Sequence, residues 1–172
     1  MKNLLILILA LFISACSTLK TNVDYNPKYD FSNVRTFAVV HKIKEGENSL
    51  VADRITKAIK KVLKQKGLKE VDVKKADLVF LFHLNVTNKT DIYTDYQMVG
   101  YGRYGGMVIA TPRSYNYDEG RLIIDAFDSK INKTVYRVEA IDEIKNKKTP
   151  QKREEYINEV ISEALKDFLV KK

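Results

Sequence analysis

The segment Ala76-Asp-Leu-Val-Phe-Leu-Phe-His-Leu-Asn-Val86 decides the fold, because it is the most apolar stretch of the chain beyond its N-terminal leader. Residues 78–82 are apolar without alternation. This pattern is typical of a strand that is buried on both of its faces. The sequence therefore predicts a central strand with the other elements packed around it.

The segments before this strand predict another strand and a helix. Residues 35–41 form a short segment rich in β-forming side chains and are predicted as the first strand. Residues 49–66 carry apolar side chains at three- and four-residue steps, with Ser49 as the expected N-cap and Gly67 as the stop. The opposite face of this helix is cationic and consists of Arg54, Lys57, Lys60, Lys61 and Lys64. Such a face is either the solvated side of a packed helix or a surface that meets a membrane.

The segments after the central strand predict a hairpin and a second helix. Residues 120–128 and 134–141 are two β-rich runs around turn-forming residues. Residues 150–170 are amphipathic, with Thr149 as the cap and Pro150 in the first turn. The order β-α-β-(variable hairpin)-β-β-α therefore predicts an α+β fold. In this fold two amphipathic helices cover one face of a mixed sheet of four or five strands.

A secretory signal precedes the domain. Lys2 and the apolar run 4–13 lead to Ile13-Ser-Ala-Cys16, which resembles a bacterial lipobox. In lipoproteins with this motif the signal is cut before the cysteine, which then carries diacylglycerol on sulfur and an acyl chain on nitrogen. Ten apolar residues are too few to span a bilayer, for which a helix needs about 20, whereas two or more acyl chains anchor a protein stably.

These features give the expected domain organisation. Residues 1–15 are predicted as a lipoprotein signal peptide, and Cys16 is predicted as the lipidation site. Residues 16–22 are expected to be the lipidated N-terminus and a tether, and residues 23–172 a single domain. The alternative is an ordinary secreted protein whose cleavage site happens to precede its one cysteine.

The chain is basic, with 30 Lys and Arg against 22 Asp and Glu and a net charge of +8. In a cytosolic protein this charge would raise nucleic acid as a partner. Behind a lipobox it points instead to the membrane surface, to anionic lipid headgroups or to an acidic partner protein. The alternative is that the lysines serve only solubility.

The sequence predicts no enzyme, and no catalytic residue, cofactor site or metal site is expected. It contains no HExxH, Walker-type loop or GxSxG motif. His41 and His83 lie on expected strands without a neighbouring histidine or cysteine. Asp125 and Asp128 share one expected strand at an odd offset, so they would point to opposite faces and make a poor acid–base pair.

Residues 93–117 hold six of the ten tyrosines and four of the seven glycines. Tyrosine and arginine on a flexible backbone are typical of a contact surface, because the rings offer apolar area and a hydroxyl at low entropic cost. The same composition suits insertion among lipid headgroups. The alternatives are a long hairpin without a partner and a hairpin whose tyrosines pack on the sheet. The candidate contact residues are Tyr93, Tyr96, Tyr101, Arg103, Tyr104, Arg113, Tyr115 and Tyr117.

Several short motifs, in their order along the chain, resemble the DUF4136 family of bacterial envelope lipoproteins. The motifs are residues 23–27, 29–32 and 35–37, the helix end at 66–67, residues 76–78 before a strand that ends at His83, and residues 119–128 and 135–137. The family often has tryptophan where this chain has Tyr136. The resemblance implies a lipidated α+β domain that faces the periplasm of a Gram-negative host. It implies no activity, because the function of the family is not established. Ser17 after the cysteine then favours the outer membrane.

Two functions remain open from the sequence. The first is a non-enzymatic adaptor or accessory subunit of an envelope assembly, anchored in the outer membrane through Cys16 and making contact through residues 93–117. The alternative is a lipid- or small-ligand-binding transport-auxiliary lipoprotein. In that case a groove between the sheet and the helices would hold an acyl chain.

Overall fold

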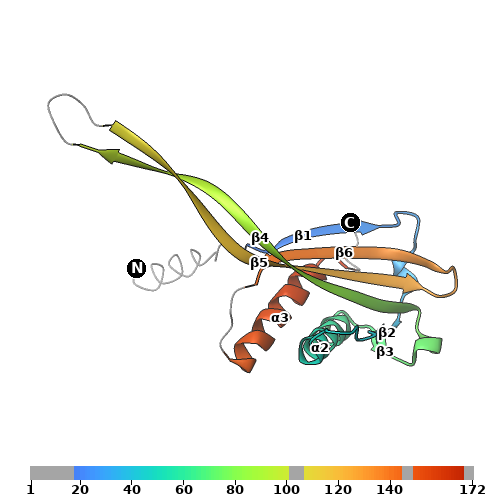
Figure 1. Cartoon of the computed structure of the whole chain (residues 1–172). Helices are drawn as coiled ribbons and strands as arrows, with labels where there is room; N and C mark the ends of the chain where they lie inside the picture. Colours follow the sequence, from blue (N-terminus) through green and yellow to red (C-terminus); the bar gives the residue numbers. More distant parts are fainter. Residues whose placement is uncertain (1–17, 101–106, 145–148, 169–172) are drawn as a thin grey trace, which may run out of the picture.

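The computed structural model describes residues 18–100, 107–144 and 149–168, and these form a six-stranded sheet with two helices on one face (Figure 1). The strand order is β1-β6-β5-β4-β2-β3. The strands are β1 (Lys20–Tyr25), β2 (Thr36–Val40), β3 (Lys69–Glu70), β4 (Leu78–Val99), β5 (Met107–Asp128) and β6 (Lys133–Glu143). The helices are α2 (Ser49–Gln65) and α3 (Pro150–Ala164), with short 3-10 turns η2 (Phe31–Asn33) and η3 (Val73–Lys75).

The predicted α+β class is confirmed, but the predicted number of four or five strands is wrong. β2 runs parallel to β4 and β3, while the pairs β4–β5, β5–β6 and β1–β6 are antiparallel. The additional strands are β1, which pairs with β6, and the two-residue β3, which pairs with β2. Residues 20–22 therefore belong to the sheet and not to the expected tether over 16–22.

The central strand is confirmed as β4, which lies between β2 and β5. Phe80 and Phe82 are buried on the face that the helices cover, and Val79 is buried on the other face. Beyond α3, the ring of Phe168 closes the core. Its centroid lies 4.9 to 6.0 Å from those of Phe31, Phe80 and Tyr136. These edge-to-face contacts join η2, β6 and the segment after α3 to the central strand.

Both helices begin, and α2 also ends, close to the residues predicted from the sequence. The N-cap of α2 is Asn48 rather than Ser49, because the Asn48 side chain accepts from the backbone N–H groups of residues 50 and 51. Gly67 ends this helix with a φ of +87°, a conformation that glycine adopts without a steric penalty. The predicted Thr149 cap and Pro150 are confirmed. The regular part of α3 ends at Ala164, earlier than the expected residue 170.

β4 and β5 continue far beyond the sheet as a two-stranded ribbon (Figure 1). We call residues 87–99 and 107–119 the arm. Its thirteen residue pairs run from Thr87 with Glu119 to Val99 with Met107, and they span about 40 Å at the usual rise of a strand. The variable hairpin expected around residues 93–117 is regular paired strand at 93–99 and 107–117, continuous with the strands of the sheet. Residues 101–106 lie outside the described part.

Candidate functional site

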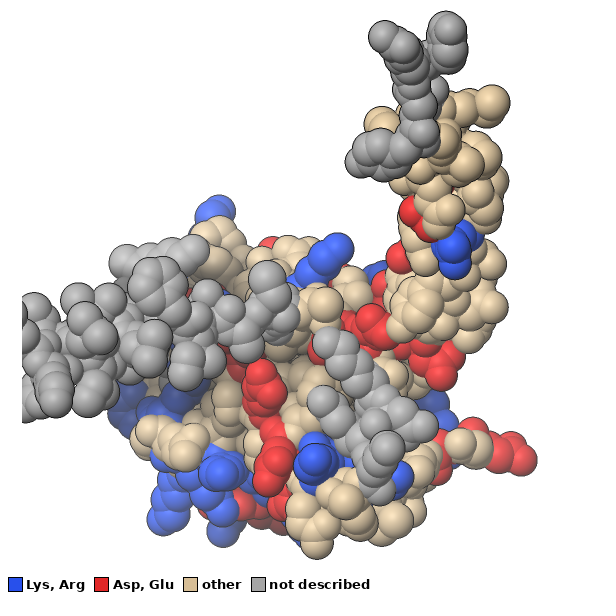
Figure 2. All heavy atoms as spheres, turned by 90° about the vertical axis from the view of Figure 1, so that its left-hand side faces the viewer, with Lys and Arg blue, Asp and Glu red and all other residues tan. Residues whose placement is uncertain are grey.

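One face of the outer arm is apolar and uncharged. Directly paired residues point to the same face of an antiparallel pair, and successive residues alternate between faces. Ile92, Tyr96 and Met98 share one face and are 76%, 70% and 72% exposed. Figure 2 shows the arm as mainly uncharged surface. This apolar face consists of Ile92, Thr94, Tyr96 and Met98 on β4 and their partners Ser114, Pro112, Ala110 and Val108 on β5.

The opposite face of the arm carries an ion pair and is braced at its base, and toward the tip it also exposes Val99, Met107 and Ile109. Arg113 Nε lies 3.1 Å from Asp95 Oδ2. Nearer the sheet, the rings of Tyr115 and Tyr117 stack with their centroids 5.8 Å apart. The Tyr115 hydroxyl donates to Glu143 Oε1 at 2.7 Å, and this hydrogen bond raises the pKa of Tyr115. This face therefore stiffens the ribbon and joins it to β6.

The structure separates the predicted contact residues. Tyr96 lies on the apolar face, whereas Tyr93, Arg113, Tyr115 and Tyr117 lie on the opposite face. The other predicted contact residues, Tyr101, Arg103 and Tyr104, lie outside the described residues. The described members of the predicted contact set are therefore divided between the two faces of the arm, and their role in contact stays a prediction.

Sequence reasoning missed the aliphatic members of the apolar face. Ile92, Met98 and Val108 are all more than half exposed in the structure. The alternation of side chains over residues 92–98 was the available signal, because it places Ile92, Tyr96 and Met98 on one face of a strand.

A second feature is an apolar groove of about 670 Å³ between the sheet and both helices, near the base of the arm. Its volume falls within the usual range for small-molecule sites, about 300–1,000 Å³. A Cβ at Gly120 would come within 3.0 Å of Ile144 Cγ1, so glycine leaves room for this side chain at the edge of the groove. The apolar lining includes Leu84, Leu122 and Ala140 of the sheet, Val51 and Ile55 of α2, and Ile157 and Val160 of α3.

Two pairs of polar side chains line this groove, His41 with Glu47 and Asp142 with Tyr156. His41 Nε2 lies 2.8 Å from Glu47 Oε1, and the His41 ring stacks on Phe82. The backbone N–H of Lys44 and the bond to His41 lower the pKa of Glu47. Asp142 accepts from the hydroxyls of Tyr156, at 2.6 Å, and of Thr18. Burial and the bond to Asp142 raise the pKa of Tyr156.

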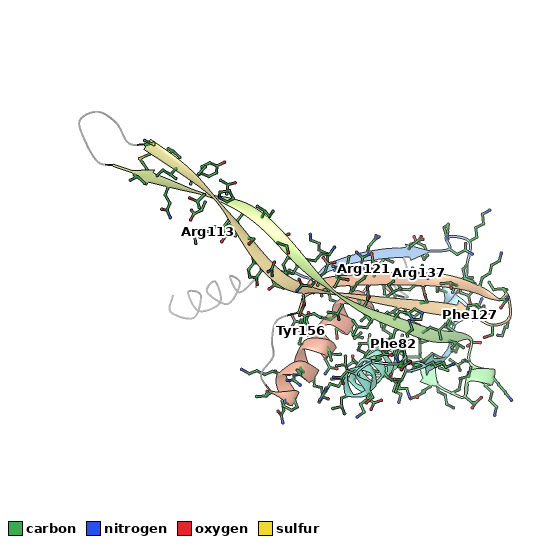
Figure 3. The ribbon with its side chains drawn as sticks, in the orientation of Figure 1. Phe82, Arg113, Arg121, Phe127, Arg137 and Tyr156 are labelled. Carbon is green, nitrogen blue, oxygen red and sulfur yellow. The ribbon has the colours of Figure 1, made fainter. Side chains whose placement is uncertain are left out.

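The buried acids have structural partners. Asp125 forms a two-point ion pair with Arg137, with N–O distances of 2.6 and 2.8 Å, on the face away from the helices (Figure 3). Asp128 accepts from the Tyr29 hydroxyl at 2.7 Å. The two carboxylates therefore serve different contacts. In the described ranges, no group of three or more His, Cys, Asp or Glu side chains is placed to hold a metal ion.

The cationic face of α2 is partly neutralised. Lys60 Nζ and Lys64 Nζ each lie 2.7 Å from a carboxylate oxygen of Glu70. Lys57 and Lys61 are exposed. The pairing with Glu70 favours the interpretation of this face as the solvated side of a packed helix.

The chain belongs to the DUF4136 family, a domain of unknown function, whose model matches residues 21–168. It is similar in fold to a PDZ domain protein from Parabacteroides distasonis, with a TM-score of 0.60 and 17% identity. That match covers 99% of this chain but spans only 41% of the other protein. The chain is also similar to PelC from Paraburkholderia phytofirmans, a dodecamer, with a TM-score of 0.52 and 8% identity. That match covers 90% of this chain and 99% of PelC. No curated protein matches.

At these identities the solved structures establish the fold alone. None of the helices in the described ranges is long and apolar enough to cross a membrane. Cys16 and the predicted signal peptide lie outside the described residues, so lipidation stays a prediction from the sequence.

Proposed function

We propose that this protein is a non-enzymatic, lipid-anchored accessory subunit of a cell-envelope assembly, which binds a partner protein through the arm. The observation that carries the proposal is the apolar face of the arm, where three large side chains are at least 70% exposed on one side of a ribbon. Contiguous exposed apolar surface of this kind marks interaction sites in soluble domains.

The arm has little support of its own. An isolated two-stranded ribbon is at best marginally stable in water, and its outer backbone edges offer unpaired hydrogen-bonding groups. Among the strands that the structure describes, none pairs with most of the arm, from Asn88 with Asp118 outward, as a third strand. A partner that covers the apolar face would bury Ile92, Tyr96 and Met98 and add stability to the ribbon.

The charge of the arm favours a protein over an anionic membrane surface. Its described residues include two basic side chains, Lys89 and Arg113. They also include four acidic side chains: Asp91, Asp95, Asp118 and Glu119. With Arg103, which lies between the two strands in the sequence, residues 87–119 hold three basic against four acidic side chains, so they offer no basic cluster to anionic headgroups. PelC is a dodecamer, so a second copy of the chain is one form that the partner can take.

The envelope location is supported by the sequence. Cys16 ends the lipobox-like segment, and Ser17 follows it. We propose that the lipid anchor sits in the inner leaflet of the outer membrane, with the domain facing the periplasm.

A crosslinking pull-down from the native envelope tests this function. The variant Ile92→Ser/Tyr96→Ser/Met98→Ser should lose the partner and keep the fold, as checked by circular dichroism. The matched control is Tyr93→Ser/Gln97→Ser/Thr111→Ser, which changes the neighbouring pairs on the opposite face of the arm and should retain the partner. Equal recovery of the partner with both variants would reject the proposal.

The groove supports a second candidate function, the binding of a lipid or small apolar ligand. Its volume of about 670 Å³ and its apolar lining favour an acyl chain over a polar ligand. Mass spectrometry of lipids that co-purify with the protein tests this function. Ile157→Trp should fill the groove and remove the lipid, whereas Ile131→Trp, on the exposed β5–β6 turn, should not.

A further inference from the structure

The described chain starts at the edge of the groove. The hydroxyl of Thr18 donates to Asp142, and the Tyr156 hydroxyl donates to the same carboxylate. Leu19 and Asp142 both line the groove. From Lys20 onward, β1 pairs with β6. The first described residues are therefore fixed to the sheet beside the groove rather than held on a long tether.

The position of Thr18 limits where a lipid on Cys16 can be. Two residues of fully extended chain span about 7 Å. The predicted lipidation site, Cys16, is two residues before Thr18. Acyl chains on Cys16 would therefore start within about 7 Å of Thr18, whose hydroxyl bonds to Asp142 in the lining of the groove.

The number of acyl chains permits one of them to leave the bilayer. The lipid chemistry predicted for Cys16 supplies two chains on sulfur and one on nitrogen. Two acyl chains are enough for stable anchoring. Docking one chain in the groove would leave two in the membrane, so the anchor and the docked chain are compatible.

We propose that the groove binds one of the acyl chains attached to Cys16 of the same molecule. The bound chain would lie along Leu84 and Leu122 of the sheet, between Val51 of α2 and Ile157 of α3. This inference rests on the lipidation that the proposed function includes. It deepens the second candidate function by naming the source of the ligand.

Metabolic labelling with a photoactivatable fatty acid tests the proposal in the full lipidated protein. Cells incorporate the label, the isolated envelope is irradiated, and crosslinked peptides are identified by mass spectrometry. We expect the N-terminal Cys16 peptide to be joined to peptides of α2 or α3. Ile157→Trp should reduce this intramolecular product at least fivefold, and the matched Ile131→Trp should leave it unchanged.

The other outcomes overturn the proposal in distinguishable ways. A lipidated Cys16 peptide with no crosslink to α2 or α3 would reject the docked chain and leave the anchor intact. A phospholipid adduct on the groove peptides, equally strong in Cys16→Ser, would assign the groove to bilayer lipid. A Cys16 peptide without any acyl chain would reject both the docked chain and the proposed lipid anchor. None of these results depends on the arm.

Discussion

At the scale of single residues, the motifs shared with the DUF4136 family have structural roles. Asp77 Oδ2 accepts from the Thr36 hydroxyl at 2.7 Å and from the backbone N–H groups of Arg35 and Thr36. Lys130 Nζ lies 3.2 Å from the other carboxylate oxygen. These bonds join the starts of β2 and β4. They lower the pKa of Asp77 to about 2, and the bond from Thr36 is the largest cause.

This geometry predicts a pH-dependent contribution of Asp77 to stability. Because the folded-state pKa lies below the ordinary value of 3.8, the ionised form stabilises the fold above that value and the gain is lost as pH falls toward 2. Asp77→Asn mimics the protonated acid and should cost about 2 kcal/mol at pH 7. Urea unfolding at pH 7 and pH 3 checks this. The difference between wild type and variant should fall by about half at pH 3, and an unchanged difference would contradict it.

Two tyrosine hydroxyls, the buried one of Tyr136 and the half-buried one of Tyr29, give opposite expectations. The Tyr136 hydroxyl is buried without a hydrogen-bond partner among the described residues, and burial raises its pKa to about 12. Tyr136→Phe should therefore raise the free energy of unfolding by about 1 kcal/mol. Tyr29→Phe should lower it by about 1 kcal/mol, because the Tyr29 hydroxyl bonds to Asp128. Denaturant unfolding of the two variants checks both signs, and a loss of stability in Tyr136→Phe would refute the first.

At the scale of elements, local patterns predicted the helices and the β5–β6 hairpin. The apolar positions of α2, the Thr149 cap and the turn before Lys133 depend on neighbouring residues, so the sequence alone could show them. β1 and β3 are short and polar and form by pairing with distant strands, which no local pattern reveals. The sequence indicated a variable hairpin around residues 93–117, but not that its strands continue β4 and β5 of the sheet, because the glycines and tyrosines there do not form a clear strand pattern.

The arm should be dispensable for folding. Replacing residues 91–115 with Asn-Gly would join Thr90 to Asn116, which are already paired, by a two-residue hairpin turn. The removed residues lie outside the hydrophobic core. We expect the melting temperature to change by less than about 4 °C, which corresponds to under 1 kcal/mol. A thermal melt checks this, and a loss of cooperative unfolding would show that the arm is part of the folding unit.

At the scale of the whole molecule, the start of β1 and the base of the arm lie at the same end of the sheet. Lys20, at the start of β1, pairs with Ile141 of β6, and Glu143 of the same strand pairs with Glu119 at the base of the arm. The apolar face of the arm lies within about 40 Å of the base of the arm. If Cys16 carries lipid, the membrane is at this same end of the sheet. We therefore expect the partner to be bound at the membrane or close to it.

This arrangement leads to a prediction about the anchor. Cys16→Ser should release the protein from the membrane fraction and lower the yield of crosslinked partner at least tenfold, because the effective concentration near the membrane is lost. Fractionation at high salt, followed by the pull-down, checks both effects. Retention of the variant in the membrane at high salt would contradict the lipid anchor.

The identity of the partner could not be predicted from the sequence. The apolar face is visible only after the register of β4 and β5 is known, because pairing brings Ile92 opposite Ser114 and Met98 opposite Val108. The groove also needs the fold, since its lining comes from six separate segments of the chain. Composition alone indicated a contact surface near residues 93–117, but it did not show which side chains share a face.

The most direct test of the account is a photo-crosslinking scan along the arm in the native envelope. A photoreactive amino acid replaces each residue from 91 to 98 in turn. We predict that positions 92, 94, 96 and 98, which lie on the apolar face, crosslink to one protein. Positions 91, 93, 95 and 97, on the opposite face, should not crosslink to it. Adducts without this alternation, or adducts with lipid alone, would contradict the claim that this face binds a partner protein.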